Sequence, residues 1–431
     1  MKMHNWVAER LGENVTHKKG YAFKSDWFQS EGIPVVKVTN FSEAGIDATN
    51  LVFVTEEIAF EKKGYALNNK DIIIQTVGSW PNNPASVVGK VVRVPNELDG
   101  ALLNQNAVIL RPNNKIDKNF LFYLLKDRSF KGYIINTAQG AANQASITLD
   151  SIFRFDFFLP PPETQKKIAA VLSAYDDLIE NNNKRIALLE KAAEEIYREW
   201  FVRLRFPGWE TAVFQKDVPE GWELRKAFTH VKGKSYTSIE INDDGEGMPF
   251  VNLKSINRGG GYRTDGLKYY TGRYKENQVV RQNDIIMAVT DMTQNRDVVG
   301  RVARIPETID VAFVISLDIV KIVPEKVSST FLYSYLRYSG FGHFIKEFAN
   351  GANVLHLNPD LVSKQSVIIP PKPLRDKFDG IVEPILKQID SLNRKTATLQ
   401  KSRDLLLSRL ISGKLPVADL DIQFPPSMIS D

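Results

Sequence analysis

Side chains that can read the edges of DNA bases are concentrated in two polar loops. The first is residues 75–86, QTVGSWPNNPAS, and the second is residues 288–297, AVTDMTQNRD. Asn and Gln form paired hydrogen bonds with adenine, and Arg does so with guanine. The same residue types also make ordinary polar turns, so both interpretations remain open. Two further loops, residues 139–148 and 350–358, offer amides that would either reach a DNA groove or cap the strand that follows.

A segment rich in cations and tyrosines precedes the second loop. Residues 254–275 contain six Lys or Arg and four Tyr with a single acid, Asp265. Such a surface suits contacts to DNA phosphates, which fix orientation, together with some contact to bases. The corresponding residues 43–57 of the first half are more acidic, and the lysines of that half lie at residues 18–24. We therefore expect the two halves to read different sequences.

The candidate DNA-contacting residues come from these loops, from the cationic segment, and from polar residues at the end of the β-branched run 33–38 or just after it. They are Lys37, Thr39, Asn40, Thr76, Ser79, Trp80, Asn82, Asn83, Gln139, Asn143, Gln144, Lys254, Ser255, Asn257, Arg258, Tyr262, Arg263, Lys268, Thr290, Asp291, Thr293, Gln294, Asn295, Arg296 and Asn353.

Motifs for catalysis are missing from the sequence. There is no cysteine, which excludes thiolate nucleophiles, disulfides and Cys-ligated zinc. No Walker phosphate loop, H-E-x-x-H zinc motif or G-x-S-x-G nucleophile elbow occurs, and the five His show no metal-ligand spacing. A methyltransferase's glycine-rich cofactor loop and N/D-P-P-aromatic tetrapeptide are also absent. We predict a binding or scaffolding chain with no catalytic residue, metal or cofactor of its own.

The sequence repeats itself at an offset of 210 to 216 residues. Each half predicts a β-rich region, a short helix, a polar loop, a proline pair and a long helix. The framework is shared whereas the polar loops differ, which favours two binding units of one design. In order along the chain, residues 32–37 match 247–252, residues 69–73 match 282–286, and residues 88–91 match 299–302.

The two long helices carry heptad patterns. Core positions run from Ile168 to Trp200 in the first helix and from Phe378 to Leu410 in the second, at 4-3 spacing throughout. More than four heptads of this period predict a coiled coil. Asn182 interrupts the first seam, where it either fixes the register or meets solvent or another subunit. Thr396 and Arg403 interrupt the second. The expected helix–helix contacts are Ile179, Asn182, Ile186, Leu189, Ile389, Leu392, Leu399 and Leu406.

These elements predict an α+β fold of two tandem β-rich domains with short helices, each followed by a long helix. We expect the helices to pair as an antiparallel coiled coil with pseudo-twofold symmetry. They would then act as a ruler between two DNA-reading domains. The predicted parts are the first domain at 1–160, a helical spacer at 161–205, the second domain at 206–370, a second spacer at 371–416 and a tail at 417–431.

Composition permits DNA binding without establishing it. The net charge of the 431 residues is +5, and no segment forms a strongly basic arm. The opening residues MKMHNW lack the apolar stretch of a signal peptide. No apolar run approaches the roughly 18 residues of a membrane span. We expect a soluble cytoplasmic protein.

Over about residues 6–415 the chain resembles the specificity (S) subunits of type I restriction-modification systems. The resemblance rests on the duplicated plan and on the order of several short runs, of which none is decisive alone. These runs are 159–168 (LPPPETQKKI), 179–182 (IENN), 195–201 (EIYREWF), 253–256 (LKSI), 260–263 (GGYR), 290–292 (TDM) and 408–413 (SRLISG).

The resemblance implies two target-recognition domains that read a bipartite, asymmetric site in double-stranded DNA with a non-specific gap. It implies docking of two modification subunits, which methylate adenine with S-adenosylmethionine. It also implies restriction subunits, which act with ATP and Mg²⁺. All three cofactors would be bound by the partner subunits.

Three alternatives remain. A nuclease or methyltransferase lacks its motifs here, and activity of the isolated chain would favour it. The recognition subunit of a type IIB restriction system would be identified by its neighbouring genes. A coiled-coil scaffold would bind no duplex, even with its partner subunits.

Overall fold

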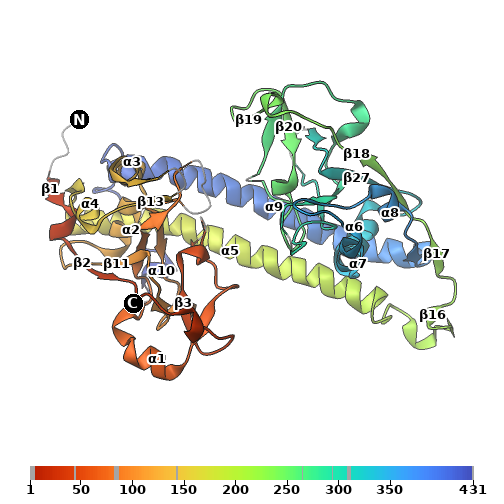
Figure 1. The fold of residues 1–431 in the computed structure, drawn as a ribbon, viewed down its shortest axis with the longest axis horizontal. Helices are drawn as coiled ribbons and strands as arrows, with labels where there is room; N and C mark the ends of the chain where they lie inside the picture. The colour runs from red at the N-terminus through yellow and green to blue at the C-terminus, as the bar shows by residue number, and fades with distance from the viewer. Residues whose placement is uncertain are drawn as a thin grey trace. The chain divides into compact units, whose positions relative to one another are not determined.

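The computed structural model describes residues 5–42, 45–81, 87–141, 144–264, 266–293, 295–307 and 312–429. The chain forms two compact units, which can be followed by residue colour in Figure 1. Unit 1 is Met1–Glu180 with Ala397–Asp431, and unit 2 is Asn181–Thr396. The long helices α5 (Pro162–Phe201) and α9 (Lys372–Ile411) each contribute one part to either unit. The segments predicted as spacers are therefore shared between the two compact units.

Unit 1 is built on a four-stranded antiparallel sheet, whose central strands are buried runs of Ile, Val and Leu. Its strand order is β2 (Val15–Lys19), β11 (Ala107–Pro112), β7 (Ile72–Gln75) and β9 (Val91–Arg93). Its other strands are β1 (Val7–Arg10) with β14 (Asp156–Leu159), β3 (Ile33–Val36) between β10 (Leu102–Leu103) and β6 (Val52–Val54), β13 (Gln144–Ser146) between β12 (Gln139–Ala141) and β8 (Val77–Gly78), and β4 (Phe41–Ser42) with β5 (Gly45–Ile46). Its shorter helices are α1 (Glu56–Glu61), α2 (Lys118–Lys126), α3 (Arg128–Thr137), α4 (Leu149–Phe153) and α10 (Pro426–Ile429).

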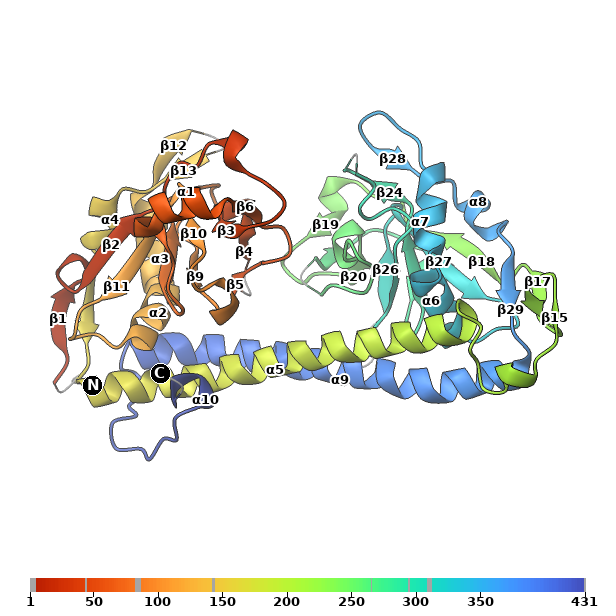
Figure 2. The ribbon, with the colours of Figure 1, turned by 90° about the horizontal axis from the view of Figure 1, so that it is seen from below.

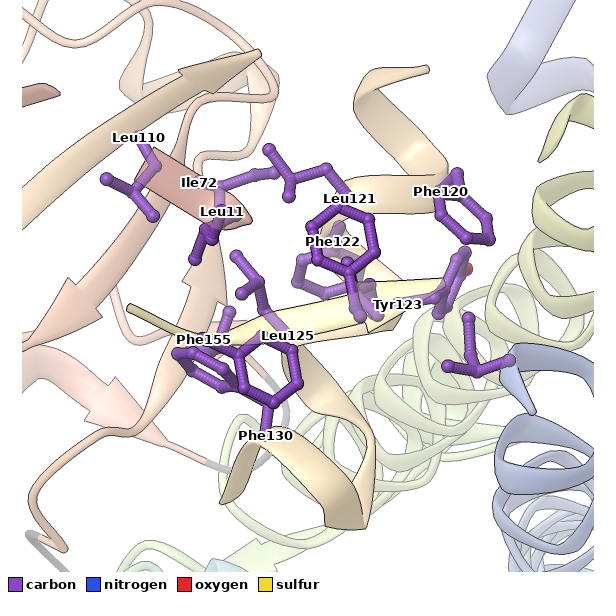
Figure 3. Packing of buried hydrophobic residues seen from close by; sticks show 14 of the residues in the cluster. Leu11, Ile72, Leu110, Phe120, Leu121, Phe122, Tyr123, Leu125, Phe130 and Phe155 are labelled. Atoms are coloured by element: carbon purple, nitrogen blue, oxygen red, sulfur yellow. The ribbon is translucent and has the colours of Figure 1, made fainter. Parts of the chain in front are cut away.

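The core of unit 1 is centred on α2. Every residue from Asn119 to Leu125 in this helix is buried, which is the pattern of a helix covered on all sides. One side packs against the sheet, and Figure 3 shows Tyr123 beside the long helices. The cluster includes Leu172 of α5 and Leu410 of α9. Unit 1 therefore needs residues from both ends of the chain to complete its core.

Unit 2 repeats the main sheet of unit 1 with equivalent strands in the same order. The order is β18 (Phe228–Lys232), β27 (Ile319–Pro324), β23 (Ile285–Ala288) and β25 (Val302–Arg304). A five-stranded sheet has the order β19 (Ile241–Asn242), β21 (Lys268–Tyr270), β20 (Met248–Val251), β26 (Phe313–Ile315) and β22 (Val279–Val280). The remaining pairs are β24 (Thr290–Asp291) with β28 (Leu355–His356), β17 (Glu223–Arg225) with β29 (Val367–Ile369), and β15 (Phe214–Gln215) with β16 (Val218–Pro219). The shorter helices are α6 (Ser329–Tyr338), α7 (Phe341–Ile345) and α8 (Pro359–Ser363).

The two long helices run antiparallel. Within unit 1, Arg403 of α9 lies 2.7 Å from Asp176 of α5. Within unit 2, the ring of Trp200 near the end of α5 lies 5.9 Å from that of Phe378 near the start of α9. Early residues of one helix thus meet late residues of the other, and the predicted fold class is confirmed. At 1.5 Å per residue, each 40-residue helix is about 60 Å long.

The predicted seams follow the covered sides of both helices. All predicted helix–helix residues are buried or half-buried, with Ile179, Ile389 and Leu392 among the most buried. Of the two polar interruptions in α9, Arg403 is neutralised by Asp176, and Thr396 is buried. Among the described residues, no helix is long and apolar enough to cross a membrane.

Candidate nucleic-acid interface

In each unit, the strand that leaves the main sheet meets a hairpin that comes much later in the sequence. In unit 1, β7 leads into β8, which pairs with β13 of the β12–β13 hairpin. In unit 2, β23 leads into β24, which pairs with β28. Figure 2 shows both of these edges on the side of their own unit away from α5 and α9. Segments that are distant in sequence, Val77–Gly78 with Ala145–Ser146 and Thr290–Asp291 with Leu355–His356, are thereby brought together.

The unit 1 edge presents amides and one anchored indole. Gln139 and Gln144 are exposed and lie on opposite strands of the hairpin, where Gln139 is opposite Ser146 and Gln144 is opposite Ala141. Trp80 is half-buried, and its Nε1 donates a 3.0 Å hydrogen bond to the carbonyl of Ala141. This bond ties the loop after β8 to the hairpin. The described parts of the two predicted loops of the first half thus lie side by side.

The unit 2 edge is organised by the carboxylate of Asp291. Its oxygens accept hydrogen bonds from the backbone N–H groups of Thr293, Val298 and Val299, at 2.6 to 3.0 Å. They also accept one from the Thr293 hydroxyl, at 2.8 Å. Burial raises the pKa of Asp291, but these hydrogen bonds outweigh burial and leave the pKa below its usual value. Asp291 therefore holds the loop in shape.

That loop projects a side chain that the sequence analysis did not select. Met292 directly follows Asp291 and is 76% exposed. An apolar side chain on a DNA-reading loop suits contact with a thymine methyl group. The clustering of amides and cations drew attention to its neighbours. A lone methionine gives no comparable signal in sequence.

Two predicted contacts stabilise equivalent turns. Asn40 ends the 3-10 turn Val38–Asn40, where its Oδ1 accepts from the backbone N–H of Lys37 at 2.9 Å. Ser255 ends the matching turn Leu253–Ser255, where its Oγ accepts from the N–H of Asn252 at 3.2 Å. Both side chains are buried. Such hydrogen bonds close a turn in the way that a cap closes a helix end.

Five of the predicted DNA contacts require correction on grounds of burial. A side chain without accessible surface would have to leave its site in the protein before it could touch a base. Each is therefore assigned to the framework of its unit. The five buried residues are Asn40, Ser79, Ser255, Thr290 and Asp291.

The remaining candidates are at least partly accessible where the structure describes them. Exposed residues are Thr39, Gln139, Gln144, Lys254, Asn257, Arg258, Arg263, Asn295 and Asn353. Half-buried residues are Lys37, Thr76, Trp80, Tyr262, Lys268, Thr293 and Arg296. Asn82, Asn83, Asn143 and Gln294 lie outside the described residues.

The cationic segment of unit 2 adjoins the Asp291 loop. Arg258 Nε lies 3.8 Å from Asp297 Oδ2, which links the segment to that loop. Lys268 is instead held 2.6 Å from Asp243, so part of its charge is neutralised. Burial raises the pKa of Tyr262, which favours its neutral phenol. The segment thus contributes exposed cations at one end of the unit 2 edge.

Buried polar contacts attach each unit to its long helices. In unit 2, Arg304 of β25 lies 2.7 Å from Asp390 of α9, and the exposed fractions of the two side chains are 8% and 6%. In unit 1, Asp176 of α5 accepts from the Tyr123 hydroxyl of α2, also at 2.7 Å. The same carboxylate receives Arg403 of α9. In the described part of the chain, no group of three or more His, Cys, Asp and Glu side chains is placed to hold a metal ion.

Comparisons with known proteins agree on one family. A model of the type I restriction modification DNA specificity domain matches residues 3–191. Two type I restriction enzyme specificity subunits of Methanocaldococcus jannaschii are similar to this chain. MjaX is 30% identical to it over 405 residues, and MjaIX is 26% identical to it over 328 residues. The MjaX alignment covers 90% of this chain and 88% of the relative. The MjaIX alignment covers 74% of this chain and 73% of the relative. The crystal structure of a type I restriction-modification S subunit from M. genitalium has the same fold, with a TM-score of 0.55 at 16% identity over 95% of this chain and 98% of that chain.

Proposed function

The chain belongs to the family of type I restriction-modification specificity subunits, and we propose that it reads two half-sites in double-stranded DNA, one with an edge of each unit. The observation that carries this proposal is the repeated strand order of the main sheets. Because of it, each unit has an edge in the equivalent place. The side chains at the two edges differ. Unit 1 offers Gln139 and Gln144, whereas unit 2 offers Met292 and Asn295 near Arg258. One framework with two sets of contacts fits an asymmetric, bipartite site.

We assign different tasks to the accessible residues. Exposed amides and arginines have the donors and acceptors needed for bidentate contacts with base edges. Lys254 acts as a point charge and suits a phosphate. The buried Asp291 and Ser255 keep the reading surfaces in shape. The exposed side chains then determine which bases are recognised. The buried ones hold the surface in shape whatever bases it recognises.

The long helices provide surface for the modification subunits in this proposal. Their pairing leaves large apolar side chains exposed on both helices: Leu178 and Leu188 on α5, and Ile381 and Leu405 on α9. In this proposal these side chains become covered when a modification subunit docks. The modification subunits would bring S-adenosylmethionine and methylate adenine, and restriction subunits would bring ATP and Mg²⁺. The chain itself would supply recognition and no catalytic group.

The decisive experiment maps methylated adenine across the host genome with and without this gene. We expect a single bipartite motif to lose methylation when the gene is deleted and to regain it on complementation. Purified alone, the chain should transfer no methyl group to DNA. An unchanged methylation map in the deletion strain, or methyl transfer by the chain free of other subunits, would refute the proposal.

A residue-level test compares two arginines of unit 2. Arg263 lies in the cationic segment. Arg281 precedes the N-terminal end of β23, whereas the edge lies beyond the C-terminal end of that strand, and Arg281 pairs with Glu276 at 2.8 Å. Arg263→Ala should weaken binding by about 1–3 kcal/mol and relax one base of one half-site. Arg281→Ala removes the same charge and should leave the motif unchanged. Equal effects of the two variants would place the interface elsewhere.

A further inference from the structure

A compact group of aromatic rings lies in unit 1, outside the edge described above. Its centre is Tyr21, which stacks parallel to Trp27 at 6.3 Å between ring centroids and tilts against Tyr65 at 5.1 Å. All three rings are half-buried. They belong to the residues after β2, to the 3-10 turn Ser25–Trp27 and to the turn that follows α1. The fold thus assembles this group from two separate stretches of sequence.

Each of these three rings has a lysine ammonium over it. Lys18 lies 4.4 Å from the centroid of Tyr65, Lys62 lies 4.9 Å from Tyr21, and Lys24 lies 5.5 Å from Trp27. Two neighbouring pairs repeat the arrangement, with Lys37 over Phe28 and Lys63 over Phe60. A cation within about 6 Å of a ring centroid is attracted by the ring face. We call Lys18, Lys24 and Lys62 with Tyr21, Trp27 and Tyr65 the lysine–aromatic cluster.

The charges of this cluster are poorly neutralised within the protein. Among the described residues, neither Lys18 nor Lys24 has a carboxylate within ion-pair distance, and both are exposed. Lys62 has Glu61 at 3.8 Å. Since the rings hold the long lysine side chains in place, the ammonium groups form a fixed array. Such an array loses less conformational freedom when it binds an anion than three free lysines would.

The arrangement favours phosphates over bases as the ligand. The ring faces are occupied by one another and by lysines, so they are not open for stacking on a base. Lys18 and Lys24, by contrast, are exposed, and Lys62 is half-buried. Helix α1, which leads into Lys62, lies away from α5 and α9 in both Figure 1 and Figure 2. The β12–β13 hairpin of the reading edge is also on the side away from those helices in Figure 2.

We propose that the lysine–aromatic cluster of unit 1 binds the phosphate backbone of duplex DNA beside the half-site that this unit reads. This proposal rests on the proposed function and adds a site to it. It also accounts for the more acidic composition of unit 1 in the region where unit 2 carries its cationic segment. Unit 1 gathers its cations around aromatic rings instead.

The test measures how DNA affinity depends on salt. The full-length chain is purified with its modification subunits and titrated with a mixed-sequence duplex at salt concentrations from about 50 to 200 mM. Each lysine that neutralises a phosphate contributes about 0.9 to the slope of log K against log salt. The triple variant Lys18→Ala, Lys24→Ala, Lys62→Ala should therefore lose about 2 to 3 from the slope. Replacing the same three lysines with Arg should retain it.

Lys166→Ala is the matched control, because Lys166 is also an exposed lysine of unit 1 but lies at the start of α5, paired with Glu163 at 3.0 Å. Its slope should equal that of the unaltered protein. An unchanged slope in the triple alanine variant would overturn this inference and leave the proposed function intact. Loss of the modification subunits at unchanged slope would identify the cluster as a protein contact and also overturn it. No binding of any duplex by the unaltered complex would refute both proposals.

Discussion

Lengthening both long helices together should lengthen the gap in the recognised DNA. Helix α5 passes from unit 1 to unit 2 between Glu180 and Asn181, and α9 passes back between Thr396 and Ala397. We would insert seven residues at each point. Seven residues preserve the 3.5-residue period, so the apolar seams stay aligned. At 1.5 Å per residue, each helix gains about 10 Å.

The expected change in DNA follows from this length. With a rise of 3.4 Å per base pair, about 10 Å corresponds to roughly three base pairs. Three base pairs also turn the duplex by about 100°, since one turn takes 10 to 10.5 base pairs. We therefore expect a gap longer by about three base pairs and less efficient methylation. An insertion of four residues into α5 alone shifts its seam against α9, and such variants should largely fail to assemble.

Methylation-site sequencing of a strain that carries the lengthened chain is the assay. Both half-sites should keep their bases, because no residue at either reading edge is altered. The control places the same seven residues in the exposed turn at Lys216 and Asp217, between β15 and β16, and should leave the gap unchanged. A change in half-site bases at constant gap would refute the interpretation of the helices as a spacer.

Three further outcomes are expected. Arg304→Met should lower the free energy of unfolding by about 3–5 kcal/mol, because it leaves the buried Asp390 carboxylate unpaired. Arg198→Ala, which removes an exposed ion pair, should change it by less than about 1 kcal/mol in the same denaturant titration. A small loss in Arg304→Met would contradict the buried-pair reasoning. Asp291→Asn should cost about 1–3 kcal/mol at neutral pH. Because the folded pKa of Asp291 is lowered, its contribution is present above the unfolded value near 4 and is lost as pH falls through the folded pKa. The two unfolding curves should therefore converge in acid, and a constant difference would argue against this role. Replacing residues 206–370 with the equivalent of another family member should change one half-site in the methylation map, and a change in both would show that the units do not read independently.

The paired helices could be predicted from sequence because a heptad pattern depends only on spacing along one element. Arg403 illustrates the limit of that approach. In sequence it is an unexplained charge in an apolar seam, and only the antiparallel pairing places Asp176 beside it. The sharing of both helices between two compact units has the same origin. This sharing depends on which ends of the two helices meet, and the heptad spacing carries no information about the direction of pairing.

The polar contacts were harder to predict, because exposure depends on local hydrogen bonds. Asn40 and Thr39 are adjacent, yet Asn40 is buried by the turn it closes and Thr39 is exposed. From their residue types alone, both are equally good candidates for contact with DNA. The lysine–aromatic cluster was missed for a different reason. Its lysines could be seen in sequence, but Tyr65 and Lys62 join Tyr21 only through the fold.

The discontinuity of unit 1 has a consequence for the order in which the chain is built. Leu410, Ile411 and Val417 belong to the unit 1 core, but all of unit 2 precedes them in the chain. A ribosome adds about 5–20 residues per second, so roughly ten seconds or more separate the synthesis of Glu180 from that of Ala397. During this interval α2 and Leu172 have no α9 to cover them. Unit 2 is contiguous and is complete first. The half of the protein that is translated first is therefore the last to acquire its native core, and the nascent chain must keep an apolar surface from aggregating until then.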